Sequence, residues 1–148
     1  MIFHTNIENK TLENNNYRKV ISTQANIQLV LMSLKPNEEI GNEIHENIDQ
    51  FFRIEKGKAT AFVTDKITNK IKEYELKDGS VIIIPKGTYH NIKNVGNTDL
   101  KLYTIYSPPN HNPNLVQSNN SSLEGGYYKK YLKYKNKYLK SKKNYLNI

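Results

Sequence analysis

Two short segments of the chain hold the residue types that bind cations or transfer protons. In the first, Glu43 and His45 are two residues apart, so both side chains point to the same face of an extended strand. Gln50 opens the apolar run that follows. In the second segment, His90 opens another such run. Imidazole and carboxylate groups serve as acids, bases and metal ligands, so we expect the chemistry of this protein in these two segments.

Glycine and proline residues beside both segments predict the turns that aim these side chains. Gly57 ends the run that Gln50 opens. Gly79 follows an aspartate in a tight turn, and Pro85 and Gly87 shape the next turn immediately before His90. The candidate side chains are therefore expected close to turns, on or beside the strands that these turns connect.

The remaining pattern between residues 17 and 106 consists of short β-type runs separated by turn signals. About eight short strands at this spacing, with no helical period among them, predict an all-β sandwich or barrel. The expected strands are residues 18–23, 27–34, 50–54, 59–64, 71–76, 81–85, 90–93 and 100–106.

These two segments resemble the motifs of the cupin superfamily. The second cupin motif, G-x5-P-x-G-x2-H-x3-N, is matched at every fixed position by Gly79, Pro85, Gly87, His90 and Asn94. The first motif, G-x5-H-x-H-x3/4-E-x6-G, is matched less completely, because only its second histidine and last glycine are present, as His45 and Gly57. Glu43 replaces the first histidine, Gln50 replaces the glutamate, and Gly41 lies closer to these residues than the motif asks.

The resemblance implies a jelly-roll β-barrel with one divalent metal ion. The usual three histidines and one glutamate become the ligand set Glu43, His45, Gln50 and His90, in which one carboxylate is kept but moved. Ligands without thiolate suit Fe, Mn, Ni, Co or Zn, and the sequence does not choose among them. If Glu43 does not ligate, it is a candidate general base instead.

Cupins perform several kinds of chemistry, so three functions follow from the resemblance. The first is a metal-binding cupin that acts on a small polar metabolite, such as a carbohydrate derivative, in the manner of an isomerase or epimerase. The second is a dioxygenase-like cupin with non-haem iron, because two histidines and a carboxylate are the ligands of such iron sites. The third is a non-catalytic module that binds a small molecule or supports assembly. We expect a homodimer in each case.

Strand alternation nominates further residues around the site. The candidates for the wall of the pocket are Met32, Phe52, Ile92 and Tyr103, with Tyr106 as an alternative to the last. His111 follows two prolines and has two interpretations: a solvent-exposed histidine of a linker, which we favour, or a side chain that folds back over the pocket.

The net charge of +8 lies at one end of the 148-residue chain. Residues 1–126 hold 14 basic and 14 acidic side chains, whereas residues 127–148 hold eight lysines and no acid. A uniformly basic nucleic-acid-binding domain is therefore excluded. We divide the chain into an N-terminal extension (1–16), a β-barrel (17–113), a linker (114–126) and a basic tail (127–148).

The tail repeats Tyr and Leu every seven residues, at 131, 138 and 145 and at 132, 139 and 146. This spacing places both on one face of a helix and lysines around the rest. The Lys/Tyr repeat resembles the ends of many giant-virus proteins. Three interpretations remain: a solvated extension shaped by codon bias, a self-association helix, or non-specific attachment to nucleic acid, which is not favoured.

Composition bounds the remaining properties. The chain contains no cysteine, which excludes disulfides, thiol catalysis and cysteine-ligated zinc. No signal peptide and no apolar run long enough for a membrane span are present in the sequence. We therefore expect an intracellular, cytoplasmic protein that is not secreted, located in the host cytoplasm or the virion if it is viral.

Overall fold

The computed structural model describes residues 1–120, and the predicted basic tail and the end of the predicted linker lie outside this range. Nine strands and one short helix make up the described chain. In chain order they are α1 (Ile7–Glu13), β1 (Arg18–Thr23), β2 (Gln28–Leu34), β3 (Asp49–Lys56), β4 (Lys58–Thr64), β5 (Ile71–Lys77), β6 (Val81–Ile84), β7 (His90–Asn94), β8 (Leu100–Ser107) and β9 (Val116–Gln117).

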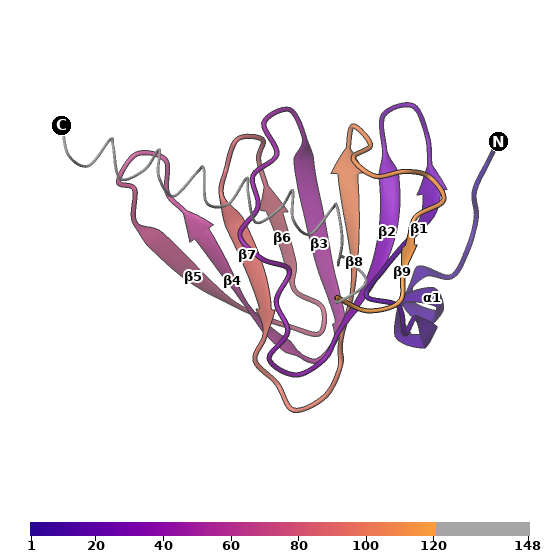
Figure 1. Cartoon of the computed structure of the whole chain (residues 1–148), viewed down its shortest axis with the longest axis horizontal. Coiled ribbons are helices and arrows are strands. Elements are labelled where there is room, and N and C mark those ends of the chain that lie inside the picture. The colour runs from indigo at the N-terminus through magenta and orange to yellow at the C-terminus, as the bar shows by residue number, and fades with distance from the viewer. Residues whose placement is uncertain (121–148) are drawn as a thin grey trace. The chain divides into compact units, whose positions relative to one another are not determined.

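The strands form two antiparallel sheets (Figure 1). The larger sheet has the order β6-β3-β8-β2-β1-β9, and the smaller has the order β5-β4-β7. Most neighbours in the large sheet are not consecutive in sequence, since β8 lies between β3 and β2, and β6 and β9 pair with β3 and β1. Such crossed connections between two sheets define a jelly roll, and the predicted all-β class is confirmed.

The core lies between the two sheets because the strands alternate between buried and exposed residues. Along β8, Leu102, Thr104 and Tyr106 are buried, and along β3 Phe52 and Ile54 are buried opposite them. Smaller buried residues from β4 face this layer from the other sheet. The period of two that predicted the strands therefore also selects the inward face of each one.

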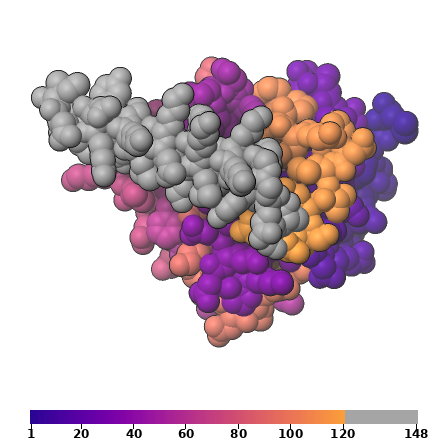
Figure 2. Space-filling model, viewed as in Figure 1, coloured from indigo at the N-terminus to yellow at the C-terminus, as the bar shows by residue number. Residues whose placement is uncertain are grey.

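Two elements lie outside the predicted strands. Helix α1 falls within the predicted N-terminal extension, and the Asn6 side chain caps it by accepting a hydrogen bond from the Asn9 backbone N–H. Strand β9 falls within the predicted linker and pairs with β1. Figure 2 shows the residues after β8, in orange, against the N-terminal strands. Each element is too short to leave a periodic pattern in the sequence.

The predicted turn glycines adopt backbone conformations that favour glycine. Gly57 has a φ of 97° and Gly79 a φ of 86°. Their surroundings differ, because a Cβ at Gly57 would lie 3.2 Å from the Asp99 carbonyl oxygen, whereas a Cβ at Gly79 would meet nothing within 4 Å. Gly57 is therefore required both by its conformation and by close packing against the start of β8.

This difference predicts unequal effects of the same substitution. We expect Gly79→Ala to lower the free energy of unfolding by about 1–2 kcal/mol, because only the backbone conformation is strained. Gly57→Ala should cost about 3–4 kcal/mol, since the added methyl group also meets backbone atoms that cannot move aside. Urea denaturation of both variants measures the difference, and equal losses would show that packing at Gly57 is not restrictive.

None of the helices in the described part of the chain has both the length and the apolar character that crossing a membrane requires.

Candidate metal centre

The backbone brings the two chemistry-bearing segments together. The chain between β2 and β3 runs beside β7, and Glu43 and His90 form an isolated antiparallel bridge. The Glu43 N–H donates to the His90 carbonyl at 2.8 Å, and the His90 N–H donates to the Glu43 carbonyl at 2.9 Å. The Gly87 N–H donates to the His45 carbonyl oxygen at 2.7 Å, so the turn before β7 also holds His45 in place.

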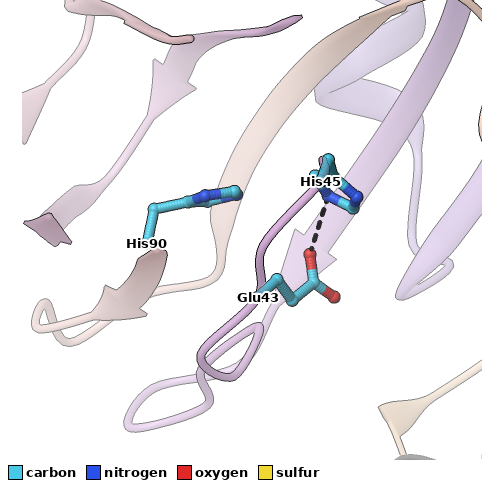
Figure 3. Close-up of side chains that lie close together, drawn as sticks. All are labelled: Glu43, His45 and His90. Carbon is cyan, nitrogen blue, oxygen red and sulfur yellow. Dashed lines mark ion pairs between the residues drawn. The ribbon is translucent and has the colours of Figure 1, made fainter. Parts of the chain in front are cut away.

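The side chains of Glu43, His45 and His90 converge (Figure 3). One ligand atom from each residue lies within 4.8 Å of those of the other two. The Glu43 Oε2 and His45 Nε2 atoms are 3.5 Å apart, and the centroids of the two imidazole rings are 5.6 Å apart. Atoms bound to one ion at about 2.1 Å lie at most about 4.2 Å apart, so a small contraction would suffice to hold a cation.

His90 presents a lone pair to this cluster. Its Nδ1 lies 2.9 Å from the Thr88 carbonyl oxygen, which can only accept a hydrogen bond, so Nδ1 carries the proton. The other nitrogen, Nε2, is then unprotonated in the neutral ring. Burial lowers the pKa of His90, which favours this neutral form. A backbone carbonyl that fixes the tautomer in this way is a common outer partner of a metal-binding histidine.

Gln50 lies beside His90, as its position in the motif implied. Its Oε1 is 3.1 Å from His90 Nε2, and its Nε2 donates to the Thr104 hydroxyl at 2.9 Å. With Nδ1 of His90 protonated, two acceptor atoms therefore face each other, an arrangement that a shared cation satisfies. Rotation of the amide would instead let Gln50 donate to His90 and accept from Thr104, which suits the metal-free site.

In addition to the two acceptor atoms of His90 and Gln50 that face each other, the His45 side chain also favours a cation. Its Nε2 is buried and has no hydrogen-bond partner among the residues that the structure describes, since the Glu43 oxygen at 3.5 Å is an ion-pair contact. A buried polar atom without a hydrogen bond is costly, and a metal ion would remove that cost. The donor set therefore fits a divalent cation.

Arg18 also reaches this cluster, which the sequence did not indicate. Its Nη2 lies 3.8 Å from Glu43 Oε1, and its Nη1 donates to the Gln117 side chain at 3.0 Å. Burial would raise the pKa of the Glu43 carboxyl, but the contact with the His45 ring and the charge of Arg18 outweigh it and hold that pKa below its usual value. Glu43 is therefore an ionised ligand candidate at neutral pH.

Tyr106 and His111 border the cluster as well. The Tyr106 ring meets the His45 ring edge to face at 5.7 Å, and the Tyr106 hydroxyl lies 3.2 Å from His111 Nε2. The sequence favoured a solvent-exposed His111, and the structure instead packs its ring on Tyr106 at 5.0 Å. The prolines before His111 gave no indication that Gln28, more than eighty residues earlier, anchors this segment.

The residues predicted for the pocket wall do not all face the core between the two sheets. Met32, Phe52 and Ile92 are buried in the core, and Phe52 meets the His90 ring edge to face at 5.9 Å. Tyr103 does not belong to this wall, because its ring stacks on Phe51 on the opposite face of the strands. Alternation along β8 places Tyr106, the alternative candidate, beside the cluster instead.

The burial of His111 predicts a pH-dependent stability. Burial, with the charge of Arg18, lowers the pKa of His111 to about 4. Between pH 6.5, the ordinary pKa of histidine, and about pH 4, His111 is protonated in the unfolded chain but neutral in the folded chain. Protonation of the unfolded chain therefore lowers the free energy of unfolding as the pH falls through this window.

We expect His111→Gln to remove this contribution. Over that pH window the free energy of unfolding should fall with a slope that is smaller by up to about 1.4 kcal/mol per pH unit than in the wild type. Chemical denaturation at several pH values measures the slope, and His4→Gln, at an exposed position, is the matched control. Identical slopes in the wild type and His111→Gln would contradict the burial of the ring.

A jelly-roll barrel with a histidine and carboxylate cluster between β7 and the segment that precedes β3 defines a protein of the cupin class. Comparison with known proteins agrees: a family model described as the cupin domain matches residues 30–106. The chain therefore belongs to the cupin family.

Three relatives illustrate the similarity. An uncharacterized protein of Acanthamoeba polyphaga mimivirus is 50% identical over 141 residues, which cover 90% of this chain and 86% of the relative. The uncharacterized protein YrkC of Bacillus subtilis (strain 168) is 45% identical over 109 residues, covering 74% of this chain and 59% of YrkC. A Bacillus halodurans protein of known crystal structure matches with a TM-score of 0.79 and 38% identity, covering 82% of this chain and 92% of that one.

Proposed function

We propose that this cupin binds one divalent metal ion through Glu43, His45 and His90, with Gln50 as a fourth, neutral ligand, and acts on a small oxygen-rich metabolite. The observation that carries the proposal is the buried Nε2 of His45, which has no hydrogen bond within the described chain and faces an ionised carboxylate. A protein interior rarely keeps such an atom unless a ligand or ion completes it.

Glu43 and His90 are already in the protonation states that a cation requires. Glu43 is ionised, and the Thr88 carbonyl holds the proton of His90 on Nδ1, away from the cluster. Metal binding to deprotonated groups needs no prior proton loss from either residue. Gln50 adds only an amide oxygen, a weak ligand, so the protein supplies three strong donors and leaves room for oxygen atoms of a substrate.

When bound, a divalent cation would polarise a carbonyl or hydroxyl oxygen of the substrate. The residues of the chain provide its setting. Arg18 balances the charge of Glu43, Phe52 packs against the His90 ring, and Thr104 orients the Gln50 amide. These contacts hold the donors in place before a ligand arrives, which lowers the cost of ordering them on binding.

Metal content tests the proposal. The purified full chain would be stripped with a chelator, reloaded separately with Fe(II), Mn(II), Co(II), Ni(II) and Zn(II), and analysed by elemental mass spectrometry. We expect about one ion per chain for at least one metal. A content below about 0.2 ions per chain for every metal would overturn the proposal, because a buried site of three strong ligands retains its ion.

A dioxygenase-like function is the second candidate, favoured by one observation. The three converging residues are two histidines and one carboxylate, which is the ligand set of non-haem Fe(II) oxygenases. Selective retention of Fe(II), with oxygen consumption in the presence of a substrate, would favour this candidate. A content near zero would leave the non-catalytic binding module as the remaining interpretation, with Gln50 in its donating orientation to His90.

A further inference from the structure

Three polar or aromatic side chains form a row across the large sheet, next to the metal ligands. Tyr106 on β8 is paired in register with Gln50 on β3 and with Gln28 on β2. All three are almost completely buried, with exposed fractions of 1%, 2% and 0% in that order. Cross-strand neighbours on one face contact each other. The row therefore connects His90, through Gln50 on β3 and Tyr106 on β8, to Gln28 on β2.

Gln28 uses its whole side chain to hold the segment after β8. Its Oε1 accepts hydrogen bonds from the backbone N–H groups of Asn110 and His111, at 3.0 and 2.9 Å. Its Nε2 donates to the His111 carbonyl oxygen at 2.8 Å and to the Thr23 hydroxyl at 2.9 Å. A buried amide with four hydrogen bonds is saturated, and three of these fix the backbone of one short segment.

The consequence of this clamp is the position of the His111 ring. Its Nε2 lies 3.2 Å from the Tyr106 hydroxyl and 3.4 Å from the Asn110 side-chain nitrogen. In this orientation of the Asn110 amide its nitrogen donates, which makes Nε2 of His111 the acceptor and leaves the ring proton on Nδ1. The Tyr106 O–H then donates to His111, so the oxygen of Tyr106 can only accept further hydrogen bonds. The neighbouring Gln50 side chain interacts with this oxygen, and one lone pair remains for a ligand.

We propose that Tyr106 and His111 form a hydroxyl-recognising pair of this site, in which Tyr106 Oη accepts a hydrogen bond from a hydroxyl group of a metal-chelating ligand, such as a 2-hydroxy acid. The proximity of the Tyr106 ring to His45, with ring centroids 5.7 Å apart, places the pair next to the proposed metal ligands. His111 is a positioning residue in this scheme, because it acts by committing the Tyr106 proton.

The ligand class follows from this polarity. A phenol whose proton is engaged elsewhere attracts donors and gains nothing from ether or carbonyl oxygens, which only accept. A site built to receive a hydroxyl discriminates against analogues that lack one. The ligand part of this proposal rests on the proposed metal site, whereas the direction of the hydrogen bond between Tyr106 and His111 does not.

The first experiment therefore needs neither metal nor ligand. Nitrogen-15 NMR of the full chain at pH 7 would report the tautomer of each histidine. We expect His111 as the Nδ1–H tautomer, with an Nε2 resonance that changes in Tyr106→Phe and not in Tyr103→Phe, the matched variant on the other face of β8. An Nε2–H tautomer of His111 in the wild type would overturn the proposal.

The second experiment uses the metal-loaded full chain and two probes, glycolate and methoxyacetate. Both carry a carboxylate and an adjacent oxygen for chelation, but only glycolate has a hydroxyl to donate. Isothermal titration would give the ratio of their dissociation constants in each variant. We expect Tyr106→Phe and His111→Leu to reduce the preference for glycolate about tenfold. We expect His111→Gln, which keeps an acceptor, to retain most of it, and Tyr103→Phe to retain all of it.

The outcomes separate the two proposals. A wild type that binds metal but does not prefer glycolate, or variants that keep the full preference, would overturn the hydroxyl-recognising pair and leave the metal site standing. A wild type that binds no metal would overturn the proposed function and with it the ligand class, while the NMR result would still decide the direction of the hydrogen bond.

Discussion

Replacing His90 with alanine is expected to reduce the affinity for a divalent cation by more than about 100-fold, because changes to groups that merely support a ligand already cost about 10- to 100-fold. The imidazole is one of three strong donors that converge, and no other histidine or carboxylate of the described chain belongs to this group. Competition with a chromophoric chelator measures the dissociation constant of the variant against that of the wild type.

Two companion variants make this result specific. His111→Gln changes a histidine that contacts Tyr106 and is not one of the converging ligands, so its metal affinity should equal that of the wild type. Gln50→Leu should produce a smaller loss than His90→Ala, since an amide oxygen is a weaker ligand. If His90→Ala, folded by circular dichroism, still bound metal as tightly as the wild type, the ion would have to lie elsewhere.

Replacing Asn94 with alanine is expected to lower the free energy of unfolding by about 3–5 kcal/mol, a large part of the stability of a small domain. Asn94 is completely buried. Its Nδ2 donates to the carbonyl oxygens of Leu34 and Thr98, both at 2.9 Å, and its Oδ1 accepts from the Gly96 N–H at 2.9 Å. Alanine would leave the buried Leu34 carbonyl without this bond, and it would also remove the two bonds that hold the turn at Gly96 and Thr98.

Asn91 provides the matched control on the same strand. Its Oδ1 accepts a hydrogen bond from the Gly41 N–H at 2.9 Å, but the side chain is only partly buried. Water can replace that bond, so Asn91→Ala should cost about 1 kcal/mol. Guanidinium denaturation of both variants compares the two losses. An Asn94→Ala variant as stable as Asn91→Ala would mean that the last residue of the second motif has no role in holding the turn after β7.

The departures from the first cupin motif acquire a physical meaning beside Arg18. Glu43 stands where a histidine is usual, and its carboxylate lies 3.8 Å from the buried guanidinium. A histidine at this position would place a neutral or cationic ring beside that charge. Gln50, which is neutral, stands where the carboxylate is usual. The single negative charge of the ligand set is therefore on Glu43, next to the buried Arg18 guanidinium.

Local pattern was sufficient for the strands and for the pairing of Glu43 with His45. Alternation with period two depends only on neighbours in the chain, so it predicts which residues share a face without knowledge of the partner strand. The fixed spacings around Gly79, Pro85 and His90 similarly predict a turn that leads into a strand. Helix α1 and strand β9 were not predicted, because each is stabilised by contact with the sheet and not by a pattern of its own.

By itself, the sequence determined an all-β fold from its short alternating runs, and the resemblance of its motifs to those of cupins implied the barrel and a cation site at two histidines and a carboxylate. Only the tertiary structure decided which remote residues complete the site. Arg18 is distant in sequence from Tyr106 and His111, and their meeting depends on β8 pairing between β2 and β3 and on the four hydrogen bonds of Gln28. Such contacts arise from the path of the whole chain, which no local spacing records.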